Sequence, residues 1–471
     1  MRNSPGRWLS AGALGATAAA LAVVLLRGPG ASTGINLVLL CVAFVALAVV
    51  VGAERRQRHL GRRLVLGVSG ALLVLAVVVP PTESGDVWSY AMYGRMVANY
   101  HDNPYRHTPV EYRSDPIGRR VPAFWLHSRS VYGPLFTGVS AAGMGVAGAS
   151  PLLARLFFQG LAALAVALAL WLVDRRTRDP VALALLGVNP VVVVSVVNGA
   201  HNDALVGLAV LGGALLVCAR RPAWAGAAFA AAALVKVAAV LPLAAVAFWV
   251  WCRHGRRAAV ALSAAAAGVG LTGLVVAGTS SVLDALSDAQ GRVNAGSIWA
   301  GPRRWLIESG SSPGGGRTLS WVATALAVAL TVALARRRGG TEGEAVFVVA
   351  GGAVVAYLLV GTYVLPWYLA WGLPVLVVVW RWRIGWLVMI QAAFVQLATA
   401  RPPGTALADP LSVGSPIGRL QLDLYSVGAP LLEVALVLIV VIALVHRQVT
   451  RRPDRCSSPA EAPSTSTEPA R

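Results

Sequence analysis

The chain has 471 residues, of which 57% are hydrophobic and only 13% are charged, and its mean hydropathy is +0.67. A soluble protein of this size needs about a quarter of its residues charged to cover its surface, so lipid must cover this one. The formal net charge of +20 suggests nucleic acid as a partner. The arginines argue against this, because they stand in short clusters between apolar runs, as the positive-inside rule would place them.

Fourteen apolar runs are candidate membrane-spanning helices. They cover residues 8–26, 35–53, 64–81, 151–173, 181–197, 203–219, 223–236, 238–252, 258–277, 318–335, 345–361, 365–380, 384–400 and 428–446. The fold class is therefore all-α, a polytopic membrane protein with about 13 or 14 crossings. With both termini in the cytoplasm, every arginine cluster between runs falls on the cytoplasmic side. Residues 132–150 are apolar but must be re-entrant or interfacial, because a crossing there would invert everything downstream.

This topology predicts one multi-spanning domain, residues 1–452, in the plasma membrane. Its large exoplasmic loops are residues 82–130, 279–317 and 401–427, and these loops should form the functional site. The tail, residues 453–471, is rich in Ser, Pro, Glu and Thr, so we expect it to be a disordered cytoplasmic segment. The four cysteines are far apart and show no CxxC spacing, which favours neither a disulfide nor a zinc site.

The stretch GDVWSYAMYGRMVANYHDNPY, residues 85–105, concentrates polar side chains directly after the third apolar run. Asp86 is either a helix N-cap or a catalytic carboxylate at the membrane boundary. The residues after it predict an interfacial amphipathic helix with Tyr90 and Tyr93 on one side. These aromatic residues either bind a ligand or only form the interfacial aromatic belt.

Polar residues also interrupt the apolar sequence at NGAHNDAL, which contains His201, Asn202 and Asp203. Asn and Asp are common in a tight turn, but a turn needs no histidine, and polar groups beside hydrocarbon are costly enough to suggest a function. Lys236 is the only lysine of the chain. It either extends its ammonium group to the membrane surface or holds a phosphate.

Two further motifs lie in predicted exoplasmic turns. GTYVLPWYLAW brings together Tyr363, Trp367 and Tyr368, whose flat rings suit a sugar face or an isoprenoid chain as well as an ordinary interface. GSIWAGPRRWL carries Arg303 and Arg304 on the face where arginine is otherwise sparse, which makes them a candidate anion clamp. No nucleotide-binding or hydrolase fingerprint occurs in a suitable context.

In these motifs the chain resembles the GT-C glycosyltransferases, and most closely the actinobacterial polyprenol-phosphate-mannose-dependent α-1,6-mannosyltransferases, with the family 87 enzymes as more distant relatives. The resemblance rests on Asp86 with YGRMVANYHDNPY, on YGP at residues 132–134, on HND at residues 201–203 and on LPWYLAW at residues 365–371. It covers roughly residues 35–446.

The resemblance implies transfer of a sugar, expected to be mannose, from a polyprenyl-phosphate donor to a glycolipid or glycan acceptor at the exoplasmic face of the cell membrane. Asp86 would be the general base of an inverting reaction. Lys236, Arg303 and Arg304 would bind the donor phosphate. Tyr90, Tyr93, His201, Asn202, Asp203, Tyr363, Trp367 and Tyr368 would contact the sugar or the acceptor.

No cofactor is implied, although a divalent metal remains open because the acidic residues show no recognisable ligand spacing. The alternatives are an arabinosyl- or glucosyltransferase of the same superfamily and, in a different class, a secondary transporter. A transporter should have repeated halves with its site near the middle of the bilayer, and this sequence shows neither.

Overall fold

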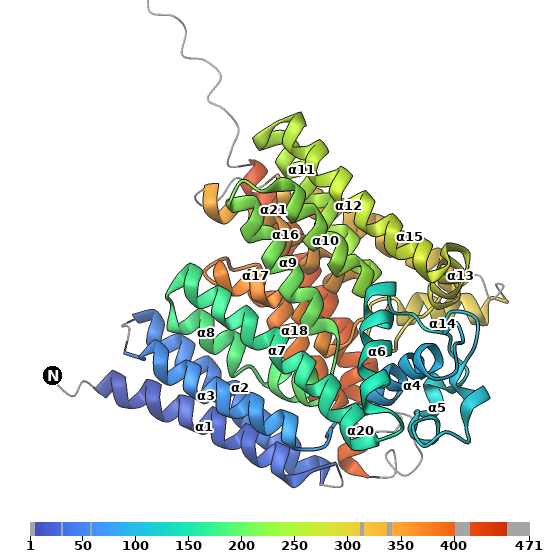
Figure 1. The fold of residues 1–471 in the computed structure, drawn as a ribbon. Coiled ribbons are helices and arrows are strands. Elements are labelled where there is room, and N and C mark those ends of the chain that lie inside the picture. Colours follow the sequence, from blue (N-terminus) through green and yellow to red (C-terminus); the bar gives the residue numbers. More distant parts are fainter. Residues whose placement is uncertain are drawn as a thin grey trace, which may run out of the picture.

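The computed structural model describes residues 5–29, 32–56, 59–310, 315–336, 342–400 and 415–449. Within these ranges the chain forms helices and no strands (Figure 1), which confirms the predicted all-α, polytopic fold. The predicted tail, residues 453–471, and most of the loop at residues 401–427 lie outside the described residues.

The first half of the chain forms a bundle with a small helical cap. Its elements are α1 (Pro5–Arg27), α2 (Thr33–Arg56), α3 (Arg62–Val78), α4 (Asp86–Ala98), η1 (Pro109–Tyr112), η2 (Gly118–Arg120), α5 (Ala123–Leu126), α6 (Pro134–Ala147), α7 (Pro151–Thr177), α8 (Pro180–Gly187), η3 (Val191–Asn198), α9 (Asp203–Cys218) and α10 (Pro222–Val235). In Figure 1 the helices α4, α5 and α6 lie together beside the longer helices.

The second half completes the bundle. Its elements are η4 (Val237–Ala239), α11 (Val240–His254), α12 (Arg256–Ala277), α13 (Thr279–Ala289), α14 (Ala300–Glu308), α15 (Gly315–Ala335), α16 (Glu342–Val360), η5 (Pro366–Trp371), α17 (Leu373–Val378), α18 (Gly385–Thr399), α20 (Pro416–Asp423), η6 (Leu424–Gly428) and α21 (Ala429–Val449). Among these, α16 and α17 pack in the interior with α9.

Eight helices among the described residues are long and apolar enough to cross a membrane, or nine if the bent pair α8 and η3 is one span. Helices α9, α10 and α18 coincide with predicted spans but have only 16, 14 and 15 residues. The prediction of 13 or 14 crossings therefore stays a prediction. Helix α6 has 14 residues, fewer than the roughly 20 that a full crossing needs, so it suits the re-entrant or interfacial placement.

Two predicted spans are not continuous α-helices. The run at residues 181–197 bends by 46° between α8 and η3, where Pro190 lacks an N–H and the Asn189 side chain accepts a hydrogen bond from the Val191 N–H at 3.0 Å. The run at residues 365–380 divides into a 3₁₀ helix and the short helix α17 around Gly372. Both irregular segments contact the candidate site described below.

Contacts between helix ends agree with the predicted sorting of charge. At one end, Arg62 pairs with Asp174 at 2.6 Å, and the Trp380 indole donates to Asp179 at 3.2 Å. All four residues belong to predicted cytoplasmic segments or lie at their edges. The polar loops meet one another at the other end. The assignment of each end to a membrane side stays a prediction.

One asparagine ties the chain that leaves α3 to the end of η3. The Asn198 amide donates to the carbonyl groups of Ala76, Val79 and Pro80, each at 3.1 Å, and its oxygen accepts from the Thr82 N–H at 2.8 Å. Asn198 itself has no exposed surface. These bonds satisfy carbonyl groups at the C-terminus of α3 and bring the start of α4 beside the turn that carries His201.

Cysteine labelling tests the sidedness. Ser130 and Ser297 lie in predicted outer loops but are fully buried, so the exposed residues Ser114 and Glu308 are better positions. In a background without native cysteines, Ser114→Cys and Glu308→Cys should react with a membrane-impermeant thiol reagent in intact cells. Ala219→Cys, in the exposed turn after α9, should react only after permeabilisation. The reverse pattern would overturn the predicted topology.

Candidate active site

A carboxylate with no exposed surface lies at the centre of the polar cluster. Asp203 is the first residue of α9, and its Oδ1 accepts hydrogen bonds from the Lys236 ammonium at 2.7 Å and from the Trp371 indole. Its Oδ2 has no hydrogen-bond partner among the described residues and lies 3.8 Å from Nδ1 of His201. A buried charge is stable only when it is paired and hydrogen-bonded, so these contacts fix the relative positions of the segments that supply them.

Lys236 is held in an aromatic cage. Its Nζ lies 4.4 Å from the ring centroid of Tyr368, 5.3 Å from that of Trp371 and 5.9 Å from that of Tyr132. The side chain is 13% exposed. The faces of the rings attract the ammonium, and Asp203 neutralises it, so its charge is already compensated within the protein.

His201 lies between the two aspartates of the cluster. Its Nδ1 is 3.2 Å from the Tyr90 hydroxyl, and its ring stacks on Trp367 with centroids 3.9 Å apart. Burial, with Lys236 adding to the effect, lowers the pKa of His201 well below its usual range, so the imidazole is neutral. The preceding Ala200 has a φ of +61°, which is uncommon for a residue with a Cβ and marks the tightness of this turn.

Asp86 does not cap a helix with its side chain. It is the first residue of α4, whose N-cap is Gly85, and no side-chain cap bond forms there. Instead Oδ1 accepts a hydrogen bond from the Trp125 indole at 2.8 Å, and Oδ2 lies 3.9 Å from Nδ1 of His201. The Asp86 side chain is 17% exposed, whereas that of Asp203 is completely buried. Of these two carboxylates, only Asp86 is open to a substrate.

The environment of Asp86 also suits proton transfer. Burial raises the pKa of its carboxyl to about 6, while the bond from Trp125 and the charge of Lys236 partly oppose this effect. A general base works best when its pKa lies near the working pH. A carboxylate with this pKa is ionised at neutral pH and can still accept a proton, so it meets this requirement.

The other predicted site residues differ in their access to a ligand. Tyr90 and Tyr93 are buried, and the Tyr93 hydroxyl donates to the Ser128 carbonyl at 2.7 Å, so both rings hold α4 in place. The Asn202 amide is buried and has no hydrogen-bond partner in the described part of the chain. The half-buried aromatic side chains are those of Tyr363, Trp367 and Tyr368.

Arg303 and Arg304 lie on α14. Arg304 is exposed and Arg303 is half-buried. Among the described residues, no hydrogen bond, ion pair or ring contact joins either of them to the Asp86 and Asp203 group.

Three residues that the sequence analysis did not single out belong to the cluster or its border. Trp125 bonds Asp86, and its ring lies under the guanidinium of Arg292, whose Cζ is 5.2 Å from the ring centroid. Glu83 accepts a hydrogen bond from the Ser195 hydroxyl at 2.9 Å, and burial raises its pKa to about 7. None of the three interrupts an apolar run as His201 does. Their only signal in the sequence is membership of a predicted outer loop.

The described residues contain no group of three or more His, Cys, Asp or Glu side chains arranged as metal ligands. Asp203 already has Lys236 and Trp371 as partners, and the Asp86 carboxylate bonds an indole. The expectation that no cofactor is needed remains a prediction.

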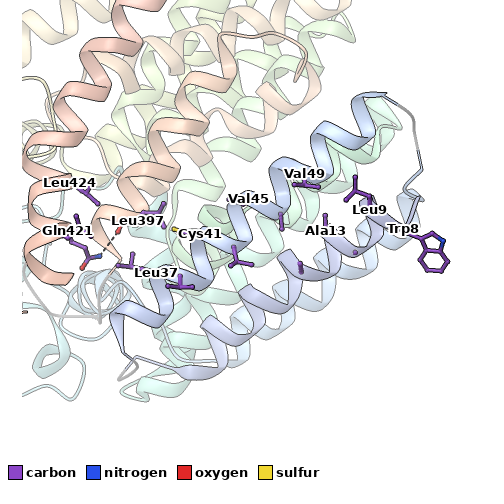
Figure 2. Close-up of a pocket in the computed structure, with 16 residues that line it drawn as sticks. Trp8, Leu9, Ala13, Leu37, Cys41, Val45, Val49, Leu397, Gln421 and Leu424 are labelled. Atoms are coloured by element: carbon purple, nitrogen blue, oxygen red, sulfur yellow. Dashed lines mark hydrogen bonds between the residues drawn. The ribbon is translucent and has the colours of Figure 1, made fainter. Parts of the chain in front are cut away.

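An apolar groove of about 800 Å³ lies on the surface formed by α1 and α2 (Figure 2). Trp8 and Leu9 are at one end of it, and Leu424 and Gln421 are at the other. Leu397 of α18 also lines the groove. The adjacent residue, Gln396, donates a hydrogen bond to Ser195 at 2.9 Å, and Ser195 in turn bonds Glu83. One end of the groove therefore approaches the loop that precedes Asp86.

Residues 8–253 match the family model described as "Alpha-(1->6)-mannopyranosyltransferase, N-terminal domain", which covers just over half of the chain. The chain belongs to this family. The matched range includes Asp86, His201, Asp203 and Lys236, so the family's N-terminal domain contains the centre of the cluster. Family membership confirms the resemblance stated from the sequence.

Two relatives carry the name Alpha-(1->6)-mannopyranosyltransferase A. The protein from Mycobacterium tuberculosis is 31% identical over 217 residues, which are 42% of this chain and 40% of the relative. The protein from Corynebacterium glutamicum is 29% identical over 191 residues, which are 39% of this chain and 38% of the relative. The matches thus span about two-fifths of the length of each relative. No solved structure matches the chain.

The ion pair predicts a specific pattern of stability. Lys236→Ala should destabilise the protein by about 3–5 kcal/mol, because it leaves Asp203 buried without its cation. Adding Asp203→Asn should restore much of that loss, and Lys236→Arg should rescue only in part, because the guanidinium is larger and planar. Thermal unfolding of the purified variants measures this. A wild-type melting temperature for Lys236→Ala, or no recovery in the double variant, would show that the pair contributes little.

Proposed function

We propose that this protein transfers mannose from a polyprenyl-phosphate donor to a glycolipid or glycan acceptor, with Asp86 as the general base. The observation that carries the proposal is the environment of Asp86. It is a partly exposed carboxylate with a pKa near 6, at the start of the largely buried helix α4 and beside a buried charged cluster. Membership of the mannopyranosyltransferase family supports the sugar and the reaction class.

The proposed reaction is a single inverting displacement. An acceptor hydroxyl approaches Asp86, and its oxygen attacks the anomeric carbon of the donor as its proton passes to the carboxylate. The bond from the anomeric carbon to the phosphate oxygen breaks, and the electron pair leaves with the polyprenyl phosphate. A β-linked mannosyl donor would give an α-linked product, in agreement with the linkage in the names of the family and of the two relatives.

The remaining residues would keep Asp86 in its working state. Lys236 favours the ionised form of Asp86, whereas Asp203 opposes it. The Lys236–Asp203 pair therefore adjusts the pKa of the Asp86 carboxyl without a direct hydrogen bond to it. The neutral imidazole of His201 adds no charge that would hold Asp86 permanently ionised. The half-buried rings of Tyr363, Trp367 and Tyr368 offer apolar faces for the sugar.

A lipid-linked donor also explains why the site lies where helices end. Its sugar is presented just outside the hydrocarbon, so a catalytic segment must begin where α3 ends. Its isoprenoid chain needs an apolar path, and the groove along α1 and α2 offers one that ends near the loop before Asp86. We place this face of the protein outside the cytoplasm, as the distribution of arginine predicts.

Replacing Asp86 with asparagine tests the base. The asparagine side chain could still accept the hydrogen bond from Trp125 but could not take up the proton. Transfer from polyprenyl-phosphate mannose to a short mannoside should fall by about a hundred- to ten-thousandfold, the usual contribution of a general base. Product formation by purified Asp86→Asn protein measures this, with the exposed loop variant Glu111→Gln as the matched control.

Near-normal transfer by Asp86→Asn would exclude it as the base. Arabinosyl and glucosyl donors on the same carrier should give no extended product, and preferential use of either would correct the assigned sugar. A wild-type protein that transfers none of these sugars but moves a solute across liposomes would favour the transporter alternative.

The pH dependence provides a second test. Because Asp86 must be ionised to accept a proton, kcat/KM should rise with pH through about 6 and then level off. The hydrogen bond from Trp125 lowers this pKa, so Trp125→Phe should move the acid limb to higher pH. Glu83→Gln is the control, because burial raises the pKa of Glu83 to about 7, and the limb near pH 6 should persist in that variant. An unchanged limb in Trp125→Phe would assign it to another group.

A further inference from the structure

Arg292 lies in the turn between α13 and α14, at the edge of the site. Its guanidinium donates a hydrogen bond to the Ser128 hydroxyl at 3.2 Å. Its Cζ lies 5.2 Å from the Trp125 ring centroid and 5.4 Å from that of Phe124. The side chain is half-buried. The guanidinium is therefore held over two aromatic rings while part of it stays open to a ligand.

No carboxylate in the described part of the chain neutralises the charge of Arg292. Among the described residues no carboxylate lies within ion-pair distance of it, whereas Arg95 pairs with Asp115 and Arg129 pairs with Asp288. Lys236, the other cation near Asp86, is already paired with Asp203. A guanidinium has five N–H donors, and Arg292 uses one of them in a side-chain bond. This combination suits a phosphate, which accepts parallel hydrogen bonds from arginine.

Arg292 and Asp86 contact the same indole ring, that of Trp125, and no ion pair joins them. Trp125 touches the carboxylate with its indole N–H and faces the guanidinium with its ring. The Tyr363 phenol is within the electrostatic reach of both groups. Burial raises its pKa to about 12, the charge of Asp86 adds to this rise, and Arg292 opposes it. In an inverting displacement the base and the leaving group act on opposite sides of the anomeric carbon, so the group that binds the phosphate must be distinct from the base.

The segment after Arg292 is fixed in place. Asn294 donates its N–H to Thr362 at 3.0 Å and its amide to the Val364 carbonyl at 2.6 Å, which attaches it to the turn that carries Tyr363. The Glu433 side chain on α21 accepts the Ile298 N–H at 2.8 Å. A binding group that is already positioned loses less entropy when its ligand arrives.

We propose that Arg292 binds the phosphate of the lipid-linked sugar donor and stabilises the charge that develops on it as the sugar leaves. This assignment rests on the proposed function and adds the residue that recognises the phosphate. It gives this role to Arg292 in place of Lys236, Arg303 and Arg304, because its guanidinium is both uncompensated and in contact with the residue that bonds Asp86.

Binding of sugar-free polyprenyl phosphate to purified protein in nanodiscs tests the assignment independently of transfer. Arg292→Gln should weaken this binding by about ten- to a hundredfold, the range expected for losing charge-assisted hydrogen bonds. Arg292→Lys should fall between Arg292→Gln and wild type, because lysine keeps the charge but not the fork of donors. The exposed loop variant Arg119→Gln should bind like wild type. With polyprenyl-phosphate mannose, Arg292→Gln should raise the donor KM and lower kcat.

Wild-type affinity in a monodisperse Arg292→Gln protein, or a larger loss in Arg303→Gln or Arg304→Gln, would overturn the assignment. If Arg292→Gln does not fold, Arg292→Lys decides in its place, because wild-type affinity there would exclude a forked contact. A wild-type protein that binds polyprenyl phosphate through Arg292 but transfers no mannose would refute the proposed function and leave the Arg292 assignment intact.

Discussion

The cost of burying the Asp203 carboxylate organises this site. A charge without exposed surface must be paired, and the chain supplies its only lysine and the Trp371 indole for that purpose. Asp203 and these two partners come from three separate segments, the start of α9, the junction of α10 with η4, and η5. Helix packing alone would allow the segments to slide. The pair specifies one arrangement, and that arrangement places His201 and Asp86 beside it.

Two aspartates in one cluster have different tasks because their surroundings differ. Asp203 is buried and paired, so it serves as a fixed negative charge. The Asp86 side chain is partly exposed, and the hydrogen bond that it accepts comes from the neutral indole of Trp125. It can therefore exchange a proton with a ligand. Other enzymes also give two neighbouring carboxyl groups different roles, because burial raises the pKa of one while the other stays ionised. In the proposed function, the aromatic side chains around them would shape the space for a sugar.

The sequence was sufficient for the helical fold because long apolar runs are a strong signal, as α7 and α16 show. It was also sufficient to select Asp86, His201, Asp203 and Lys236 as candidate site residues. Each of them interrupts or borders an apolar run, where polar groups are costly. It did not predict the breaks in residues 181–197 and 365–380, because an apolar run looks the same whether its helix is straight or bent. Hydropathy does not report the hydrogen bonds at Asn189 that accompany the first bend.

The site residues that the sequence analysis did not single out were missed for a different reason. Trp125 and Arg292 lie in loops that are polar and aromatic throughout, where nothing in the local pattern distinguishes a ligand-binding residue from a surface residue. The adjacent pair Arg303 and Arg304 on α14 attracted attention because two arginines stand together, yet no contact among the described residues joins either of them to Asp86. The tertiary contacts of Trp125 with both Asp86 and Arg292 connect these two predicted outer loops at the site.

The most direct test of the account is a structure of the Asp86→Asn protein with polyprenyl-phosphate mannose and a short mannoside acceptor. We expect the attacking hydroxyl within hydrogen-bond distance of residue 86, with the anomeric carbon between that hydroxyl and the donor phosphate. An acceptor bound elsewhere, with residue 86 separated from both sugars by other side chains, would contradict it.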